Sequence, residues 1–193
     1  MVGFLRAQPT EARARIAAAV DDRPRTKTVI ARGDQPLTLI GPTLEVGALA
    51  PDVTLVLADQ TPLRLADLRG QLVVLSVVPS IDTRVCESQT HHVSDAIPQL
   101  PAGAVVITVS RDLPFAQERF AEEAMTKTRM ASDYKGGGFG RGFGLEVEES
   151  GLLARSVWII GKDGKVAYRE LVADQTTEPT YDALIAAAQA AAK

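Results

Sequence analysis

The sequence predicts an α/β protein in which helices flank a mixed central sheet. Three observations carry this prediction. Two continuous apolar runs, QLVVLSVV (Gln71–Val78) and AVVITVS (Ala104–Ser110), have the length and composition of strands buried on both faces. A helical pattern separates them, as a parallel crossover requires. Two later apolar runs flank Lys-Asp-Gly at 162–164, which predicts a hairpin.

The other elements follow in order. Alternation around Gly33-Asp34 predicts an opening β-hairpin that begins near Thr26. The expected strands are Val53–Leu57, Gln71–Val78, Ala104–Ser110, Ser156–Gly161 and Val166–Val172. The expected helices are Leu65–Leu68, Val85 to about Ile97, Leu113–Met125 and Pro179–Ala192, with a short strand and helix before Ser156. A turn is expected between the strand Val53–Leu57 and the helix Leu65–Leu68. This order, with a β-α-β unit followed by a hairpin and a final helix, is the plan of thioredoxin-like folds.

Length and composition fit one globular domain. The chain has 193 residues, of which 46% are hydrophobic and 23% charged. A net charge of −3 argues against binding nucleic acid through its phosphates. No apolar run reaches the ~18 residues of a membrane span, and the first residues do not resemble a signal peptide. We expect a helical extension over residues 1–25, with a helix at Thr10–Val20, and the main domain over 26–193.

The single cysteine, Cys86, lies where the strand ending at Val78 passes through the segment PSIDT into a helix. Thr83 is a good candidate for the N-cap of that helix, which would place Cys86 in its first turn, where unpaired N–H groups point outward. A helix N-terminus and a nearby cation both favour the thiolate, the nucleophilic form of cysteine. Free cysteines are more often small buried hydrophobes, so placement alone leaves a structural role open.

The residues around Cys86 resemble the peroxiredoxins. Pro79 to Cys86 match P-x-x-x-T-x-x-C, and the longer string PSIDTRVCESQT is similar to the bacterial thiol peroxidases in particular. Four further segments agree in the right order: RDLPFAQERF, SDYKGGGFGRGFGLEV, GLLARSVWII and LVADQTTEPTYDALIAA. The resemblance covers roughly residues 26 to 192. It implies an antioxidant oxidoreductase, a thiol-dependent peroxidase, on a thioredoxin-like fold.

The resemblance implies roles for four residues. Cys86 would attack the O–O bond of hydrogen peroxide or an organic hydroperoxide and become a sulfenic acid. Arg155 would hold the thiolate and polarise the peroxide. Thr83 would bridge the sulfur and the peroxide oxygen, and Pro79 would shield the thiolate from water. No cofactor and no metal is implied.

Three of these residues also have an ordinary structural interpretation. Thr83 is of a type that caps helices, and Pro79 is of a type that ends strands. Arg155 has surface carboxylates such as Glu148 and Glu149 near it in the sequence. Each alternative is strong by itself, and the joint pattern with Cys86 is what favours the catalytic roles.

The chain departs from the family pattern where a second cysteine usually resolves the sulfenic acid. Ala121 stands there, after DLPFAQERF, so no intrachain disulfide can form. Three explanations are open: a one-cysteine enzyme reduced by thioredoxin or a small thiol, an intermolecular or mixed disulfide, or an engineered replacement. A redox sensor or thiol-binding module on the same scaffold, without efficient turnover, is the alternative function.

The resemblance also implies a homodimer that packs around the loops flanking the active site. Ile81 and Val93 are candidate residues of that surface. A single cysteine is compatible with a reducing compartment, and we expect the protein in the cytoplasm.

Two further motifs favour structural interpretations. Arg141–Gly144 (RGFG) matches half of an RNA-binding pattern, but Leu145 and Glu148 replace its aromatic residues. We expect a glycine-rich loop or a distorted short helix near the active site instead. His91 and His92 are adjacent and point about 100° apart on a helix, so they cannot share one metal and are expected at the surface.

Overall fold

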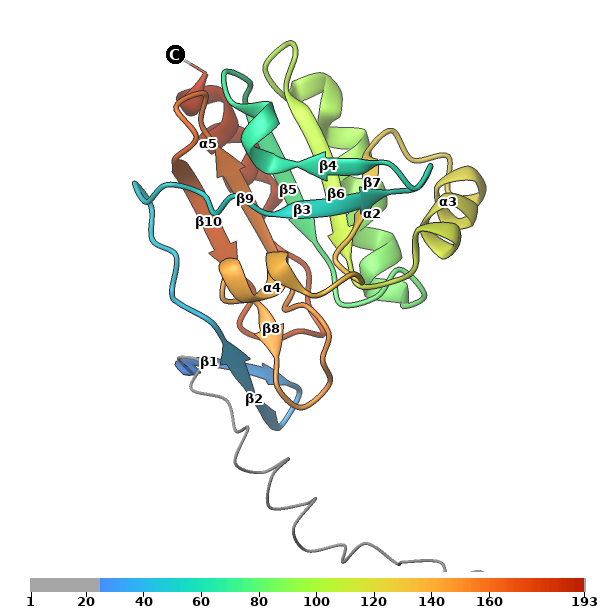
Figure 1. Cartoon of the computed structure of the whole chain (residues 1–193), viewed down its shortest axis with the longest axis vertical. Coiled ribbons are helices and arrows are strands. Elements are labelled where there is room, and N and C mark those ends of the chain that lie inside the picture. The colour runs from blue at the N-terminus through green and yellow to red at the C-terminus, as the bar shows by residue number, and fades with distance from the viewer. Residues whose placement is uncertain (1–24, 193) are drawn as a thin grey trace, which may run out of the picture.

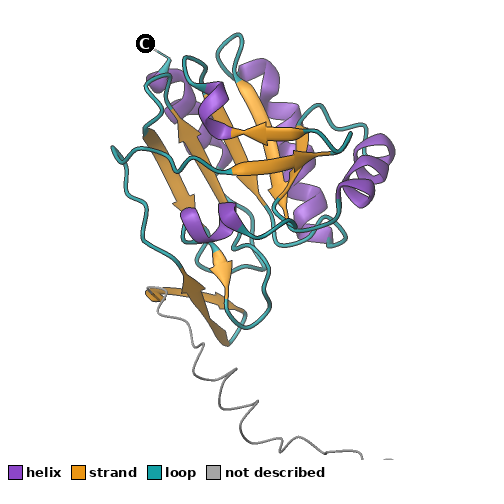
Figure 2. Ribbon diagram, in the orientation of Figure 1, coloured by secondary structure: helices purple, strands orange, loops and turns teal. Residues whose placement is uncertain are grey.

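The computed structural model of the chain describes residues 25–192 (Figure 1). The helix predicted over Thr10–Val20 lies outside the described residues, and with it the predicted extension up to residue 24. Arg25 already begins the first strand, so the hairpin starts one residue earlier than predicted. The rest of the described chain is a mixed sheet with helices on both faces, as predicted (Figure 2).

The central sheet accounts for most of the predicted strands. Its members are β3 (Thr54–Leu57), β4 (Pro62–Arg64), β5 (Val73–Val77), β6 (Val105–Ser110), β7 (Arg129–Ser132), β9 (Ser156–Ile160) and β10 (Val166–Leu171). Their order is β10-β9-β5-β6-β7-β3-β4. The β5, β6 and β7 strands are parallel, and all other neighbours are antiparallel. The β4 strand lies in a segment predicted as a turn.

The described helices match the predicted ones to within a few residues. They are the 3-10 helix η1 (Leu65–Leu68), α2 (Arg84–Ala96), the 3-10 helix η2 (Ile97–Gln99), α3 (Pro114–Glu123), α4 (Gly138–Gly142) and α5 (Tyr181–Ala191). Within residues 25–192, no helix has both the length and the apolar character needed to cross a bilayer.

Alternation along β5 divides the core between the two faces of the sheet. Val73, Leu75 and Val77 belong to one apolar cluster and Val74 to the other. The α2 and α5 helices cover the second face, to which they contribute Val93, Leu184 and Ala188. The α4 helix lies over the first face, with the side chains of Phe139 and Phe143. The end of β5 is therefore enclosed from both sides before the chain reaches Cys86.

A second, smaller sheet contains the predicted opening hairpin. It consists of β1 (Arg25–Arg32), β2 (Gln35–Ile40) and β8 (Glu146–Val147). Ile30 and Leu39 are each only 1% exposed and pack into the core of the first face. The β1 strand is also tied to the segment after β10, because Ala31 exchanges hydrogen bonds of 2.8 Å with Ala173 and Gln175.

The glycine-rich run is the short helix α4, one of the two forms predicted for it. Phe139 and Phe143 are buried, so they offer no stacking surface to RNA. The backbone N–H groups of Phe139 and Gly140 donate to the Asp133 carboxylate at 2.9 Å, which fixes α4 against the end of β7. Gly144 follows with φ +64°, and a Cβ there would lie 2.1 Å from the Pro42 carbonyl oxygen. Close approach of two backbones thus requires glycine at this point.

The prediction that Ile81 and Val93 contribute to a subunit surface is wrong. Ile81 is 2% exposed and Val93 is fully buried. Ile81 packs in the cluster around Cys86, and Val93 packs between α2 and the sheet. Both side chains are covered by residues of the same chain, so neither is exposed for contact with a second subunit.

Candidate active site

Cys86 lies in the first turn of α2, where the sequence predicts it. The side chain is fully buried against Val78, Ile81 and Met130. Three residues of α3, namely Ala116, Phe120 and Ala121, pack against the same cluster. The N–H of Cys86 is not an unpaired helix donor, because it donates to the Thr83 carbonyl at 3.0 Å. The helix start therefore acts on the sulfur through its dipole and through neighbouring side chains rather than through this amide.

Thr83 occupies the predicted N-cap position, with φ −120° and ψ 141°. Its hydroxyl does not cap the helix, however, since no side-chain capping hydrogen bond is formed. Instead Oγ1 lies 2.8 Å from Cys86 Sγ and 3.1 Å from the Ser80 carbonyl oxygen. A hydroxyl can donate to a thiolate or accept from a thiol, so this contact suits both protonation states of the sulfur.

Arg155 brings a buried cation to the sulfur. The residue precedes β9 and is 2% exposed, and its Nη2 lies 3.3 Å from Cys86 Sγ. Its other guanidinium contacts are with neutral oxygens: Gln89 Oε1 at 2.7 Å, the Gln175 carbonyl at 3.2 Å and the Val85 carbonyl at 3.4 Å. Within residues 25–192, no carboxylate forms an ion pair with Arg155. A buried cation is costly without an anion, and a thiolate at Cys86 would supply one.

The ordinary alternative for Arg155, a surface ion pair, does not occur. Glu148 pairs with Arg25 at 2.8 Å, and Glu149 accepts from the backbone N–H of Thr38 at 3.0 Å. Neither carboxylate is free to neutralise the guanidinium. The strand order explains this, because it turns Arg155 inward toward α2, while Glu148 and Glu149 lie beside the small sheet.

Pro79 opens the loop between β5 and α2 and is half-buried. No hydrogen bond in the described structure joins it to Cys86. The loop itself is fixed by Asp112, whose carboxylate accepts from Ser80 Oγ and from the N–H of Ile81, both at 2.8 Å. Because Thr83 is two residues after Ile81, Asp112 helps to define where its hydroxyl lies.

Two glutamines complete the surroundings of Arg155 and were not predicted. Gln89 is fully buried, donates to Ser76 Oγ at 2.9 Å and lies one helical turn after Cys86. That i+3 spacing is a signal the sequence offers. Gln175 is 7% exposed and lies in the segment after β10. It lies in one of the segments that resemble the family, but nothing in that segment gives it a role, and the fold brings it to Arg155.

A second polar cluster borders the site on α2 and on the segment before α5. Glu178 accepts from Ser88 Oγ at 2.8 Å, lies 2.7 Å from His92 Nδ1, and accepts from the Tyr181 hydroxyl. Burial alone would raise the pKa of Glu178, but the hydrogen bonds from Tyr181, Ser88 and His92 outweigh it and hold that pKa below its ordinary value. His92, like His91, lies at the surface, as predicted.

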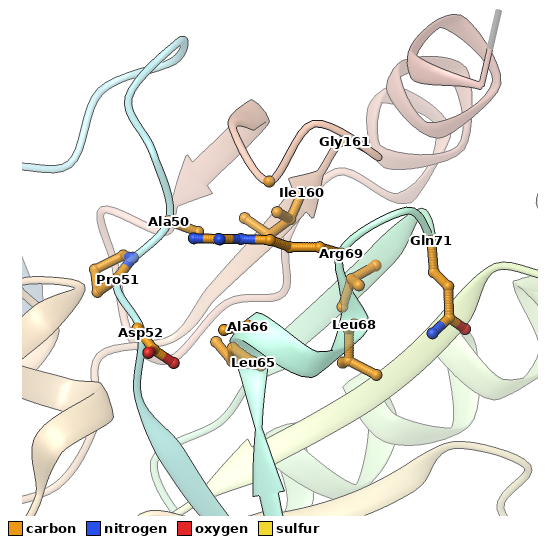
Figure 3. Close-up of a pocket in the computed structure, with 12 residues that line it drawn as sticks. Ala50, Pro51, Asp52, Leu65, Ala66, Leu68, Arg69, Gln71, Ile160 and Gly161 are labelled. Atoms are coloured by element: carbon orange, nitrogen blue, oxygen red, sulfur yellow. The ribbon is translucent and has the colours of Figure 1, made fainter.

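A pocket lies at the other end of the sheet (Figure 3). It is lined by Val73, the first residue of β5, and Ile160, the last of β9, whereas Cys86 follows the opposite end of β5. Figure 3 shows the Arg69 side chain extending across it between Ala50 and Ile160. This pocket brings no group to the sulfur. The described residues also contain no cluster of three metal-ligating side chains.

Comparison with known proteins agrees with the geometry around Cys86. The family model described as Redoxin matches residues 45–185. The thiol peroxidase of Halalkalibacterium halodurans is 41% identical over 157 residues, which cover 81% of this chain and 94% of the relative. The Bacillus subtilis thiol peroxidase is 40% identical over 159 residues, 82% of this chain and 95% of the relative.

Solved structures give the same result. The crystal structure of a peroxiredoxin-like protein from Aquifex aeolicus superposes with a TM-score of 0.79 at 36% identity, over 84% of this chain and 96% of that chain. The thioredoxin-like fold predicted from the order of elements is therefore confirmed. The chain belongs to the Redoxin family and, within it, to the thiol peroxidase group of peroxiredoxins.

Proposed function

We propose that the protein is a thiol-dependent peroxidase in which Cys86 is the nucleophile and Arg155, Thr83 and Pro79 form its catalytic surroundings. The observation that carries this proposal is a buried guanidinium without a carboxylate partner in the described chain, 3.3 Å from the only thiol. Such a guanidinium favours the ionised sulfur. A structural cysteine would have no use for it.

The reaction begins when the Cys86 thiolate attacks the terminal oxygen of a hydroperoxide. The S–O bond forms as the O–O bond breaks, and the leaving alkoxide or hydroxide takes a proton and departs as an alcohol or water. Cys86 becomes a sulfenic acid, oxidised by two electrons. Charge develops on the leaving oxygen, where the Arg155 guanidinium and the Thr83 hydroxyl are able to stabilise it. Pro79 limits access of water to the thiolate.

Recycling requires a thiol from outside the chain, because Ala121 stands at the position of the resolving cysteine. An external thiol attacks the sulfenic acid, releases water and leaves a mixed disulfide on Cys86. A second thiol then releases Cys86 and carries the disulfide away. The donor class is thioredoxin or a small thiol. Ala121 packs against the Cys86 cluster, so the position of the resolving cysteine lies beside the reactive sulfur but carries no thiol.

The working assembly is a homodimer in the cytoplasm, built on one domain over residues 26–193 with residues 1–25 as an extension. An apolar surface near the active-site loop supports dimerisation. Leu113, Phe115 and Tyr134 are 53%, 67% and 41% exposed. They adjoin Asp112, which binds the loop at Ser80. A cytoplasmic location fits the need for a steady supply of reduced thiol.

The proposal is tested by peroxide consumption with hydrogen peroxide and cumene hydroperoxide, each with thioredoxin and with dithiothreitol as donor. The parent should turn over at least one peroxide with one donor, and Cys86→Ser should be inactive. Ser88→Ala, two residues further along the same helix, serves as the matched control and should stay active. Full activity in Cys86→Ser would overturn the assignment.

The redox sensor is the second candidate, and the absence of a second cysteine favours it. Two experiments separate the two functions: substoichiometric peroxide is added and the sulfenic acid is trapped with dimedone, and turnover of excess peroxide is then measured with each thiol donor. Rapid trapping together with multiple turnovers identifies the peroxidase. Rapid trapping without turnover by any of the donors identifies the sensor.

A further inference from the structure

Gln175 holds Arg155 at two points. Its side-chain Oε1 accepts from the backbone N–H of Arg155 at 2.5 Å, and its own carbonyl oxygen accepts from Arg155 Nε at 3.2 Å. One residue thus contacts both the start of the arginine and the base of its guanidinium. Gln89 Oε1 accepts from Arg155 Nη1 at 2.7 Å, and Nη2 is directed at Cys86 Sγ.

Gln175 is itself fixed from two other directions. Its Nε2 donates to the Val172 carbonyl at 2.6 Å, and its backbone N–H donates to the Ala31 carbonyl at 2.8 Å. These partners also define how the amide is turned, since the oxygen must face the Arg155 N–H and the nitrogen must face a carbonyl. The residue is 7% exposed, so water does not compete strongly for these bonds.

We propose that Gln175 is a positioning residue that sets the Arg155 guanidinium at its distance from Cys86 Sγ. This inference rests on the proposed function and adds a residue to it. The side chain links the Arg155 backbone to the segment after β10, and the Gln175 backbone adds the bonds to β1 and to Arg155 Nε. Gln175 therefore fixes the arginine against the sheet rather than against the helix that carries the sulfur. Reaction rates are sensitive to such placement, because a shift of about 1 Å can cost about 100-fold.

The test is Gln175→Leu, which keeps the approximate size of the side chain. It removes the two side-chain hydrogen bonds, to the Arg155 N–H and to the Val172 carbonyl. The rate constant for oxidation of Cys86 by hydrogen peroxide is measured in the full chain, next to the rate of alkylation by iodoacetamide. We expect oxidation to slow by about 10- to 100-fold. Alkylation should slow or stay unchanged, since a displaced guanidinium favours the thiolate less. Gln189→Leu is the matched control, because this exposed amide donates to the Gln99 carbonyl away from the site.

A merely structural role predicts a different pattern. If Gln175→Leu only loosens the fold, the buried Cys86 becomes more accessible and alkylation accelerates. That result, or a peroxide rate within about twofold of the parent, overturns the inference. Gln175→Asn provides a second variant if the leucine chain does not fold, and its shorter amide should give the same direction with a smaller loss. Activity in Cys86→Ser would instead refute the proposed function itself, so the two failures are distinguishable.

Discussion

Two arginines lie at the same edge of the central sheet in opposite electrostatic settings. Arg111 follows the end of β6, and Arg155 precedes the start of the antiparallel β9, with β5 between them. The Arg111 guanidinium lies 2.7 Å from the Glu146 carboxylate and 3.5 Å from that of Asp133. Arg155 is the more deeply buried of the two and contacts only neutral oxygens and the Cys86 sulfur.

The difference separates an arginine that stabilises the fold from one that is available to an anion. The charge of Arg111 is balanced in the folded chain before any chemistry begins. Arg155 has no carboxylate partner among the described residues and lies against the Cys86 sulfur, so it is available to an anion at that point. The same substitution, arginine to methionine, is therefore expected to affect mainly the reaction at Arg155 and mainly stability at Arg111. Measuring both variants is the strictest test of this comparison.

The largest effect is expected for Arg155→Met, which keeps an unbranched side chain and removes the cation. The rate constant of Cys86 oxidation by hydrogen peroxide should fall by about 100- to 1000-fold. This is the usual effect of removing a preorganised hydrogen-bond donor that stabilises developing charge. The free energy of unfolding should fall less than it does for Arg111→Met, because Arg155 has no carboxylate partner in the described chain and only neutral oxygens and the sulfur lose a donor. Stopped-flow oxidation and urea unfolding measure the two quantities. A rate within about threefold of the parent would show that Arg155 is not an activating group.

Arg111→Met should give the reverse result. Removing one partner of a buried ion pair leaves Asp133, which is 2% exposed, without its cation, and we expect unfolding to become easier by about 3 kcal/mol. Oxidation of Cys86 should stay within about threefold of the parent. Urea unfolding at neutral pH and the same stopped-flow assay provide the measurements. If Arg111→Met instead slowed oxidation as much as Arg155→Met, the two arginines would not differ in the way their contacts indicate.

The sequence predicts the fold well because the fold follows from local patterns. Continuous apolar runs became β5, β6 and β9, and Lys-Asp-Gly became the turn between β9 and β10. The one strand misassigned as a turn, β4, has only three residues, too few for a periodic pattern. Ile81 and Val93 were wrongly assigned to a surface because apolar character alone does not say whether the protomer or a partner covers a side chain.

The site is less predictable than the fold, and the reason is sequence separation. Cys86 and Thr83 lie within one turn of each other, so their proximity can be deduced directly. Arg155 is 69 residues from Cys86, and only the resemblance indicated that they meet. Gln175 and Asp112 lie in two of the segments that resemble the family, but the resemblance assigns them no role, and it is the strand order that brings them to the site. Thr83 occupies the predicted N-cap position, but its hydroxyl contacts the sulfur and not a backbone N–H of the helix, a choice that the sequence pattern does not reveal.

Thr83 tests the other contact of the sulfur, with a smaller expected effect. Thr83→Val keeps the shape and removes the hydroxyl 2.8 Å from Sγ. A hydrogen bond to a charged group contributes about 1.5 to 3 kcal/mol, so oxidation should slow by about 10- to 100-fold. Thr83→Ser retains the hydroxyl and should recover most of the rate. If valine and serine gave equal rates, the hydroxyl would have no part in the reaction, and the arginine alone would account for the reactivity of Cys86.

Glu178→Gln gives the smallest effect and asks whether a carboxylate near the site matters to its chemistry. Since Ser88, His92 and Tyr181 engage this carboxylate, we expect the oxidation rate to stay within about twofold. The folded-state pKa of Glu178 is lowered, so its contribution to stability is fully present above the ordinary value of 4.5 and is lost as the pH falls through the folded-state pKa. Urea unfolding should therefore show Glu178→Gln less stable than the parent by about 1 kcal/mol at pH 6 to 7, with a gap that closes in acid. A stability difference that widened in acid would contradict the predicted sign of the linkage. Slower oxidation in Glu178→Gln would show that this carboxylate contributes to the reactivity of Cys86.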